Sequence, residues 1–332
     1  MKHFMRMALM AGVAVGAWAV SSDRGYSQAG DPNAAPNPYR MQDNWLQLPQ
    51  GRKLGGAIKV QVDHSDGNSM WVFDRCSENS CNPIQKFDSN GKFVRGFGAN
   101  MFVQPHGFYV DKEGNVWAAD NGIRNGKGGV VVKFSPEGRV LMTLGKPGMP
   151  GNAEGFLNGA SSVVVAPNGD IFVGDGHGGN TNDRVVKFDK TGKQIATWGK
   201  HGKGQGEFDQ LHGIAMDSQG RIFVADRGNS RIQVFDSNGK FVAEWKQFGR
   251  PSDVSIDKND VIYVTDDQSN QTNNPGFKTG IRVGSARDGK VTAFIPTPSA
   301  EIATPEGVGV DDAGNVYGGW TGKMAVRRWT KG

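Results

Sequence analysis

Three side chains able to bind a metal occupy the same position in a repeating pattern. His106, His212 and Glu306 each begin a short apolar segment, and each stands eight residues before a turn glycine. Two imidazoles and a carboxylate are a common ligand set for Zn²⁺ or non-haem Fe²⁺, with positions left for substrate or water. One of the six histidines lies within residues 1–29, so two of the other five share this position. We therefore expect a metal site, against the alternative that each residue is an ordinary polar side chain at a turn.

The elements that position these residues are visible in residues 210–245. This stretch holds four short segments of β-branched and aromatic residues joined by Asx/Gly turns. Such a meander cannot bury both of its faces alone, so copies of it are expected to stack. Six similar units recur at intervals of about 40 to 55 residues, a spacing typical of four-stranded propeller blades. The sequence predicts an all-β fold, a six-bladed β-propeller over residues 44–332.

The sixth unit ends after its third strand. Residues 45–48 (Trp-Leu-Gln-Leu) alternate in character and stop at Pro49, so they are expected to form an isolated strand. We predict that this strand completes the sixth blade, because joining both ends of the chain in one sheet removes the last open edge of the ring. Residues 30–43 are expected to form an extended arm before it.

Counting back from the turn glycines gives one channel position in each blade. The first strand of a propeller blade is innermost, so its first residues crowd the mouth of the central channel. The count assigns His106, His212 and Glu306 to blades two, four and six, Ser161 and Ser252 to blades three and five, and Gly56 or Ala57 to blade one. Alternate blades of six are related by roughly 120°. The two histidines and the glutamate are therefore expected to converge on one point.

The repeat units resemble NHL repeats over about residues 55–330, through segments such as IFVADRGNSRIQVFDSNGKFV. Within that group the chain is similar to bacterial relatives of the peptidyl-α-hydroxyglycine α-amidating lyases. The motifs that carry this similarity are Pro105-His106-Gly107, Leu211-His212-Gly213 and Val224-Ala225-Asp226-Arg227. The resemblance implies cleavage of the C–N bond of a carbinolamide, with release of an amide and glyoxylate.

The resemblance also implies a metal set. The family has a three-histidine zinc site on alternate blades; His106 and His212 match the first two histidines, and Glu306 replaces the third. A carboxylate can ligate zinc, although it lowers the charge of the site and weakens its Lewis acidity. The family's calcium site uses an aspartate directly after the third histidine. Gly307 occupies that position here, which argues against Ca²⁺, although the backbone carbonyl of Phe108 could still contribute.

Three further residues follow from the same comparison. His177 stands where the family has a tyrosine proposed as the base, and an imidazole can accept a proton near neutral pH. The alternative is a solvated histidine in a glycine-rich loop. Arg227 matches an active-site arginine of the family, and Arg75 has the same position in blade one, so either guanidinium could hold a substrate carboxylate through two hydrogen bonds. The alternative for both arginines is pairing with the neighbouring Asp74 or Asp226.

Two other sets of residues recur with the blades. An aspartate ends the second strand of five units: Asp74, Asp120, Asp175, Asp226 and Asp266. Its repetition predicts a structural role in capping the following turn. Large aromatic residues recur as well, and we expect them to form the core between blades: Trp117, Phe172, Phe223 and Trp245.

Residues 1–29 have the features of a secretory signal sequence. Lys2 and Arg6 supply the positive start, an apolar stretch too short to span a bilayer comfortably follows, and small residues stand at the cleavage positions before residue 30. We expect this segment to be removed, with an uncleaved membrane anchor as the alternative, and the mature protein to be periplasmic or secreted without a membrane segment. Cys76 and Cys81 are then expected to form a disulfide rather than two free thiols.

The charge balance argues against nucleic acid as a partner. The chain has 38 Lys and Arg against 33 Asp and Glu, and removing residues 1–29 leaves 35 and 32, a formal charge of about +3. These charges are scattered without a run of Lys or Arg, so the electrostatic footprint of a nucleic-acid protein is missing. We expect a small-molecule or peptide substrate, and a monomer, because a closed propeller needs no partner to fold.

Three functions are consistent with these features. The first is a metal-dependent lyase acting on an α-hydroxyglycine-like carbinolamide. The second is a lactonase-like hydrolase in which a metal-activated water attacks a carbonyl. The third is a non-catalytic NHL scaffold that binds a partner.

Overall fold

The computed structural model describes residues 30–76, 81–299, 302–322 and 325–332. Within these ranges the chain forms strands and turns, and no helix of the length and apolarity needed to cross a membrane is found in them. The predicted signal sequence, residues 1–29, lies outside the described residues.

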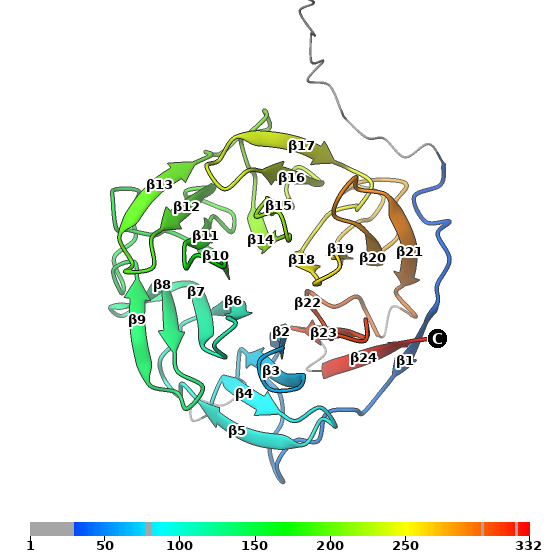
Figure 1. Cartoon of the computed structure of the whole chain (residues 1–332), viewed down its shortest axis with the longest axis horizontal. Coiled ribbons are helices and arrows are strands. Elements are labelled where there is room, and N and C mark those ends of the chain that lie inside the picture. The colour runs from blue at the N-terminus through cyan, green and yellow to red at the C-terminus, as the bar shows by residue number, and fades with distance from the viewer. Residues whose placement is uncertain (1–29, 77–80, 300–301, 323–324) are drawn as a thin grey trace, which may run out of the picture.

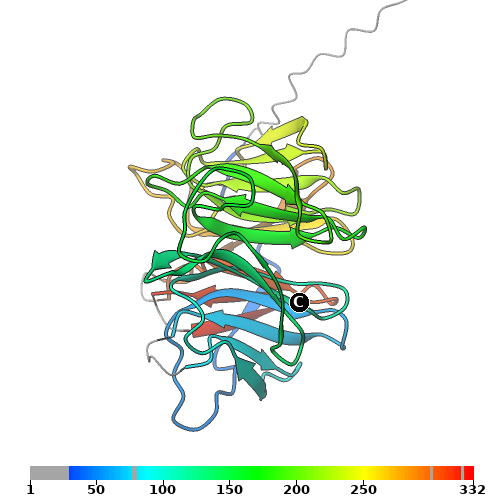
Figure 2. The same cartoon turned by 90° about the vertical axis from the view of Figure 1, so that its left-hand side faces the viewer.

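Six antiparallel sheets of four strands form a ring around a central axis, so the prediction of a six-bladed β-propeller is confirmed (Figure 1). Blades one to three are β2 (Ala57–Asp63), β3 (Ser69–Asp74), β4 (Ile84–Phe87) and β5 (Phe93–Phe97); β6 (Pro105–Val110), β7 (Val116–Arg124), β8 (Lys127–Phe134) and β9 (Val140–Leu144); and β10 (Ala160–Val165), β11 (Ile171–Asp175), β12 (Arg184–Phe188) and β13 (Gln194–Trp198). Blades four and five are β14 (Leu211–Met216), β15 (Ile222–Asp226), β16 (Arg231–Phe235) and β17 (Phe241–Trp245); and β18 (Asp253–Ile256), β19 (Val261–Asp266), β20 (Gly280–Ser285) and β21 (Val291–Pro296). Figure 2 shows the same ring from the side.

Blade six is closed by a strand from the N-terminal arm. It contains β22 (Gly307–Val310), β23 (Val316–Trp320) and β24 (Ala325–Lys331), and β24 pairs on its outer edge with β1 (Tyr39–Gln42). Closure by an N-terminal strand is therefore confirmed, but its assignment to residues 45–48 is wrong. That segment instead lies between blades six and one: Trp45 is buried against Tyr317 of blade six, with ring centroids 5.2 Å apart, and Gln47 makes a single parallel bridge to Lys92 of blade one.

Packing decides which of the two neighbouring segments becomes the closing strand. Tyr39 is only 6% exposed and joins a buried cluster with Tyr263 and Trp329. The chain reaches this place along the outside of blade five, where the Phe294 N–H donates to the carbonyl of Pro36 (Figure 1). The arm is thus fixed against β21 before β1 begins, and this leaves residues 45–48 beyond the end of β24.

Truncation of Tyr39 should weaken the closure of the ring. We expect Tyr39→Ala to lower the free energy of unfolding by about 3 kcal/mol, the usual cost of removing a buried aromatic ring. The adjacent Arg40 is exposed, so Arg40→Ala should change stability by less than about 0.5 kcal/mol. Chemical unfolding of both variants measures the difference. Equal stabilities would show that β1 does not close the propeller.

The recurrent aspartates of blades one to five hold the segments that enter the innermost strands of these blades. All five are completely buried. Asp120 accepts hydrogen bonds from the backbone N–H groups of Val103 and Gln104, at 2.7 Å each, directly before β6. Asp226 accepts from the N–H of Asp209, at 2.8 Å, before β14. The predicted structural role is confirmed, and it extends from the following turn to the segment that enters the blade. The four recurrent aromatic residues are buried in the clusters between neighbouring sheets, as expected.

Candidate metal centre

Two of the three predicted ligands, His106 and His212, lie at β-bulges in the innermost strands of their blades. The pairing of β6 with β7 skips residues between Pro105 and Phe108, and that of β14 with β15 skips His212. A bulge bends the strand and redirects the side chain of the extra residue, and here it turns the imidazoles toward the axis. Glu306 stands directly before β22 and faces the same point.

The same bulge corrects the register of blade one. The pairing of β2 with β3 skips Ile58, which lies between Ala57 and Lys59. The channel residue of blade one is therefore Ile58, not Gly56 or Ala57. The same bulge falls at Ser161 and His212, where the count from the turn glycine was right. In blade one the paired segment between the bulge and the turn is one residue longer, so the count missed Ile58.

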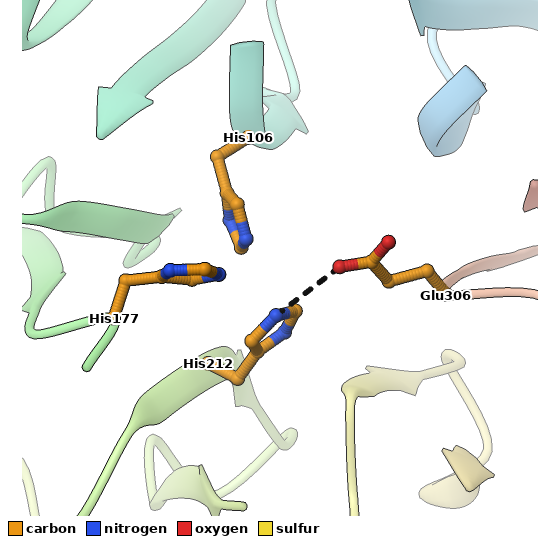
Figure 3. Close-up of side chains that lie close together, drawn as sticks. All are labelled: His106, His177, His212 and Glu306. Carbon is orange, nitrogen blue, oxygen red and sulfur yellow. Dashed lines mark ion pairs between the residues drawn. The ribbon is translucent and has the colours of Figure 1, made fainter. Parts of the chain in front are cut away.

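His106, His177, His212 and Glu306 converge at the mouth of the channel (Figure 3). One ligand atom of each residue lies within 4.8 Å of those of the other three. The His106 ring is 4.3 Å from the His177 ring and 4.5 Å from the His212 ring, measured between centroids. Nε2 of His212 lies 3.3 Å from Oε1 of Glu306. The predicted ligands therefore come together, and His177, expected as a base or a solvated loop residue, lies among them.

Neighbouring blades fix the orientation of two imidazoles. Nδ1 of His106 lies 2.6 Å from the backbone carbonyl of Ser161, and Nδ1 of His212 bonds to that of Ser252. Because a carbonyl oxygen only accepts, the proton of each neutral ring is on Nδ1, and Nε2 carries the lone pair. Such a second contact commonly orients metal-binding histidines. The serines of blades three and five thus orient the histidines of the preceding blades.

The Nε2 atoms of all three histidines are buried and make no hydrogen bond with any described residue. Burial, together with the neighbouring imidazoles, holds the pKa of His106 well below its usual value. Burial, followed by the charge of Arg227, also holds the pKa of His212 well below its usual value and lowers that of His177 to about 4. All three rings are therefore neutral near pH 7, the form in which imidazole binds metals.

Glu306 provides a negative charge opposite the imidazoles (Figure 3). Burial alone would raise the pKa of Glu306, but its electrostatic interaction with His106, the charge of Arg75 and a 2.7 Å hydrogen bond from the Thr321 hydroxyl bring it below its usual value. Three neutral imidazoles, whose buried Nε2 atoms make no hydrogen bond with a described residue, and a carboxylate fit a transition-metal ion better than Ca²⁺, which prefers oxygen ligands.

The two predicted arginines are not held by the acids beside them in sequence. Asp74 pairs with Arg52, and Asp226 pairs with Arg231 at 2.6 Å. The guanidinium of Arg227 is buried and donates to the Gln210 side chain at 3.2 Å, whereas its Nε has no partner among the described residues. Nε of Arg75 donates to the carbonyl of Pro105, at 3.2 Å.

Sequence reasoning missed Asp267. Its carboxylate accepts a hydrogen bond from the Ser252 hydroxyl, and it interacts electrostatically with Glu306 and Arg227. Asp267 follows the recurrent Asp266, as Arg227 follows Asp226, so comparison of this one position across the blades could have found it. Burial raises the pKa of Asp267 to about 6.

Cys76 and Cys81 are joined in a disulfide, as expected. Cys76 follows Arg75 directly, so the bridge lies beside one of the candidate substrate-binding residues. The two cysteines are therefore not available as thiolate ligands.

Comparisons with known proteins agree with this architecture. The NHL repeat model matches residues 208–235, which include most of blade four. The chain is 32% identical to human NHL repeat-containing protein 3 over 58% of this chain and 54% of that protein. It is 33% identical to Drosophila melanogaster peptidyl-alpha-hydroxyglycine alpha-amidating lyase 1 over 50% of this chain and 32% of that protein. A match to Xenopus laevis peptidyl-glycine alpha-amidating monooxygenase B extends over 80% of this chain and 32% of that protein, at 31% identity.

Solved structures resemble the fold at low sequence identity. A streptogramin B lyase structure aligns with a TM-score of 0.56 and 16% identity, covering 89% of this chain and 98% of that one. A gluconolactonase from Xanthomonas campestris aligns with a TM-score of 0.57 and 15% identity, covering 90% and 96%. The chain spans about half the length of NHL repeat-containing protein 3, and about a third of the lyase and monooxygenase relatives given above. It is a six-bladed β-propeller that matches the NHL repeat model in its fourth blade and is similar in sequence to the peptidyl-α-hydroxyglycine α-amidating lyases.

Proposed function

We propose that this chain is an exported, metal-dependent lyase that cleaves the C–N bond of an α-hydroxyglycine-like carbinolamide. The observation that carries the proposal is the convergence of three buried imidazole nitrogens, which make no hydrogen bond with any described residue, and one carboxylate beside the guanidiniums of Arg75 and Arg227. Sequence similarity to the amidating lyases supports the reaction class. Export is proposed from the character of residues 1–29 and is consistent with the disulfide.

His106, His212 and Glu306 would hold Zn²⁺ or Fe²⁺. When bound, the metal supplies Lewis acidity that lowers the pKa of a nearby hydroxyl group and stabilises developing negative charge. The three side chains come from separate blades, and the carbonyls of Ser161 and Ser252 hold the two imidazoles in the required tautomer. The rigid ring therefore prepares the site before the ion arrives.

Arg227 and Arg75 would bind the substrate carboxylate. A guanidinium can donate two parallel hydrogen bonds to a carboxylate, and the buried Arg227 has donors to spare. Fixing the carboxylate places the adjacent carbon, which bears the hydroxyl and the amide nitrogen, next to the histidines. In the reaction the hydroxyl loses a proton, a C=O bond forms, the C–N bond breaks, and the amide nitrogen gains a proton.

Asp267 is a second candidate, besides His177, for the group that accepts the hydroxyl proton. We expect Asp267→Asn to lower kcat by about 10²- to 10⁴-fold, the usual contribution of a general base, without loss of metal. Burial raises the pKa of Asp267 to about 6, and protonation removes its basicity. Activity should therefore fall as the pH drops through about 6, or lower where a bound cation favours the carboxylate, and the variant should lose this acid limb.

Ser252→Ala is the matched control, because it removes the hydroxyl partner of Asp267 but keeps the carbonyl that orients His212. It should lower kcat much less than Asp267→Asn. An Asp267→Asn enzyme with full activity and an unchanged pH profile would leave His177 as the acceptor.

The proposed activity is tested by incubating the metal-loaded protein with an N-acyl-α-hydroxyglycine. Equal amounts of glyoxylate and of the primary amide are expected. Turnover of lactones without glyoxylate release would show a hydrolase instead, and a protein without bound metal and without turnover would be a binding scaffold.

A further inference from the structure

We infer that His177 is a fourth protein ligand, so that the centre consists of three imidazoles and one carboxylate. The inference rests on the proposed metal centre and changes the part assigned to His177 within it. A base would direct its free nitrogen at the substrate, whereas a ligand directs it at the point shared by the other ligands.

The free nitrogen of His177 points at that shared site. Its Nε2 is buried, has no hydrogen-bond partner among the described residues, and belongs to the group of ligand atoms that lie within 4.8 Å of one another. The His177 ring is 4.3 Å from His106 and 4.9 Å from His212, between centroids. Figure 3 shows its edge directed between the other two imidazoles, with Glu306 across from it.

The loop that carries His177 is held on both sides of the residue. The N–H of Gly176 donates to the carbonyl of Gly159 at 2.9 Å, and the N–H of Gly178 donates to the Thr181 hydroxyl at 3.2 Å. A Cβ atom at Gly176 would lie 2.5 Å from the Cα of Asp183, so only glycine allows this close approach. The backbone thus places the imidazole at the centre, in the way expected of a ligand held before metal binding.

The number of protein ligands determines which metal ion can still bind a substrate at this centre. A tetrahedral Zn²⁺ with four protein ligands is closed and resembles a structural site. Fe²⁺ and similar ions accept five or six ligands, so three imidazoles and a carboxylate still leave positions for substrate. If the centre is catalytic, the four-ligand set therefore favours a five- or six-coordinate ion such as Fe²⁺ over Zn²⁺.

The inference is tested by binding Co²⁺ to the purified protein and to His177→Ala, with affinity measured by chelator competition. Loss of a ligand should weaken Co²⁺ binding by at least about 100-fold. Loss of a residue that only supports a ligand through a hydrogen bond weakens metal binding by about 10- to 100-fold. The visible spectrum should change as well, from the weak bands of five- or six-coordinate Co²⁺ in the wild type. His201→Ala is the matched control, because His201 is two-thirds exposed and pairs with Asp183 away from the ligand group; it should bind Co²⁺ like the wild type.

Three outcomes are distinguishable. Weaker binding and an altered spectrum in folded His177→Ala, or in His177→Gln if the alanine variant is unstable, support the inference. Tight binding with an unchanged spectrum in the variant, or an intense tetrahedral spectrum in the wild type that the variant retains, overturns it and leaves the three-ligand centre. A wild-type protein that binds no Co²⁺ overturns both this inference and the proposed function.

Discussion

Replacing both His106 and His212 with alanine is expected to abolish lyase activity, by at least about 10³-fold in kcat/KM, while the propeller stays folded. Metal Lewis acidity is worth several kcal/mol of transition-state stabilisation, and each 1.36 kcal/mol is a tenfold change in rate. The fold should tolerate the change because each ring loses only its Nδ1 hydrogen bond to a backbone carbonyl, and its Nε2 makes no hydrogen bond with any described residue. Activity and thermal unfolding of the variant measure the two effects separately.

Ser161→Ala is a suitable control for this variant. It lies at the same channel position in the blade between the two histidines, and the backbone carbonyl that orients His106 is kept. It should retain most of the activity. A double-histidine variant that releases glyoxylate at the wild-type rate would contradict a role for the channel centre in the reaction.

Replacing Arg227 with alanine is expected to lower kcat/KM by about 10²- to 10⁴-fold for a substrate with a free carboxylate. Two charge-assisted hydrogen bonds of about 1.5–3 kcal/mol each would be lost. The same variant should lose the preference for a carboxylate over a carboxamide, because the guanidinium recognises the anion. Comparison of the two substrates on wild type and variant gives this preference directly.

Arg75→Ala should have a smaller effect than Arg227→Ala. Arg75 already donates through Nε to the carbonyl of Pro105, and it is less buried than Arg227. Arg227→Lys should recover only part of the loss, because an ammonium group cannot form the planar pair of hydrogen bonds. A full preference for the carboxylate in Arg227→Ala would show that this residue does not contact the substrate anion.

Repetition is what made the fold and much of the site predictable from sequence. Each blade repeats the same turn and strand, so the position of His106 in blade two fixes the equivalent positions of His212 and Glu306. The recurrent aspartates then hold the entry segments in equivalent places. Local pattern and global arrangement agree here, and alternation around a six-fold ring brings the three side chains together.

The sequence pattern alone did not identify the strand that closes blade six or the channel residue of blade one. Residues 39–42 and 45–48 both can form a strand, and burial of Tyr39 against Tyr263, with the arm fixed along β21, selects the first. In blade one, the paired segment between the bulge at Ile58 and the turn is one residue longer than in blades three and four, so the count from the turn glycine missed Ile58.

The positions of His177 and Asp267 were not predicted because both residues lie in loops outside the repeating strands. No periodic rule gives the reach of the loop after β11, so the resemblance suggested the chemistry of His177 but not its position among the ligands. Asp267 lies directly after a structural aspartate in the sequence, and only its hydrogen bond with Ser252 and its proximity to Arg227 distinguish it.

Metal analysis of the purified protein, beside the His106→Ala/His212→Ala variant, tests the account most directly. We predict about one transition-metal ion per chain, Fe²⁺ or Zn²⁺, in the wild type and none in the folded variant, as expected when two of the central ligands are lost. A wild-type protein without metal, even after reconstitution with both ions, would contradict the metal centre and, with it, the proposed lyase.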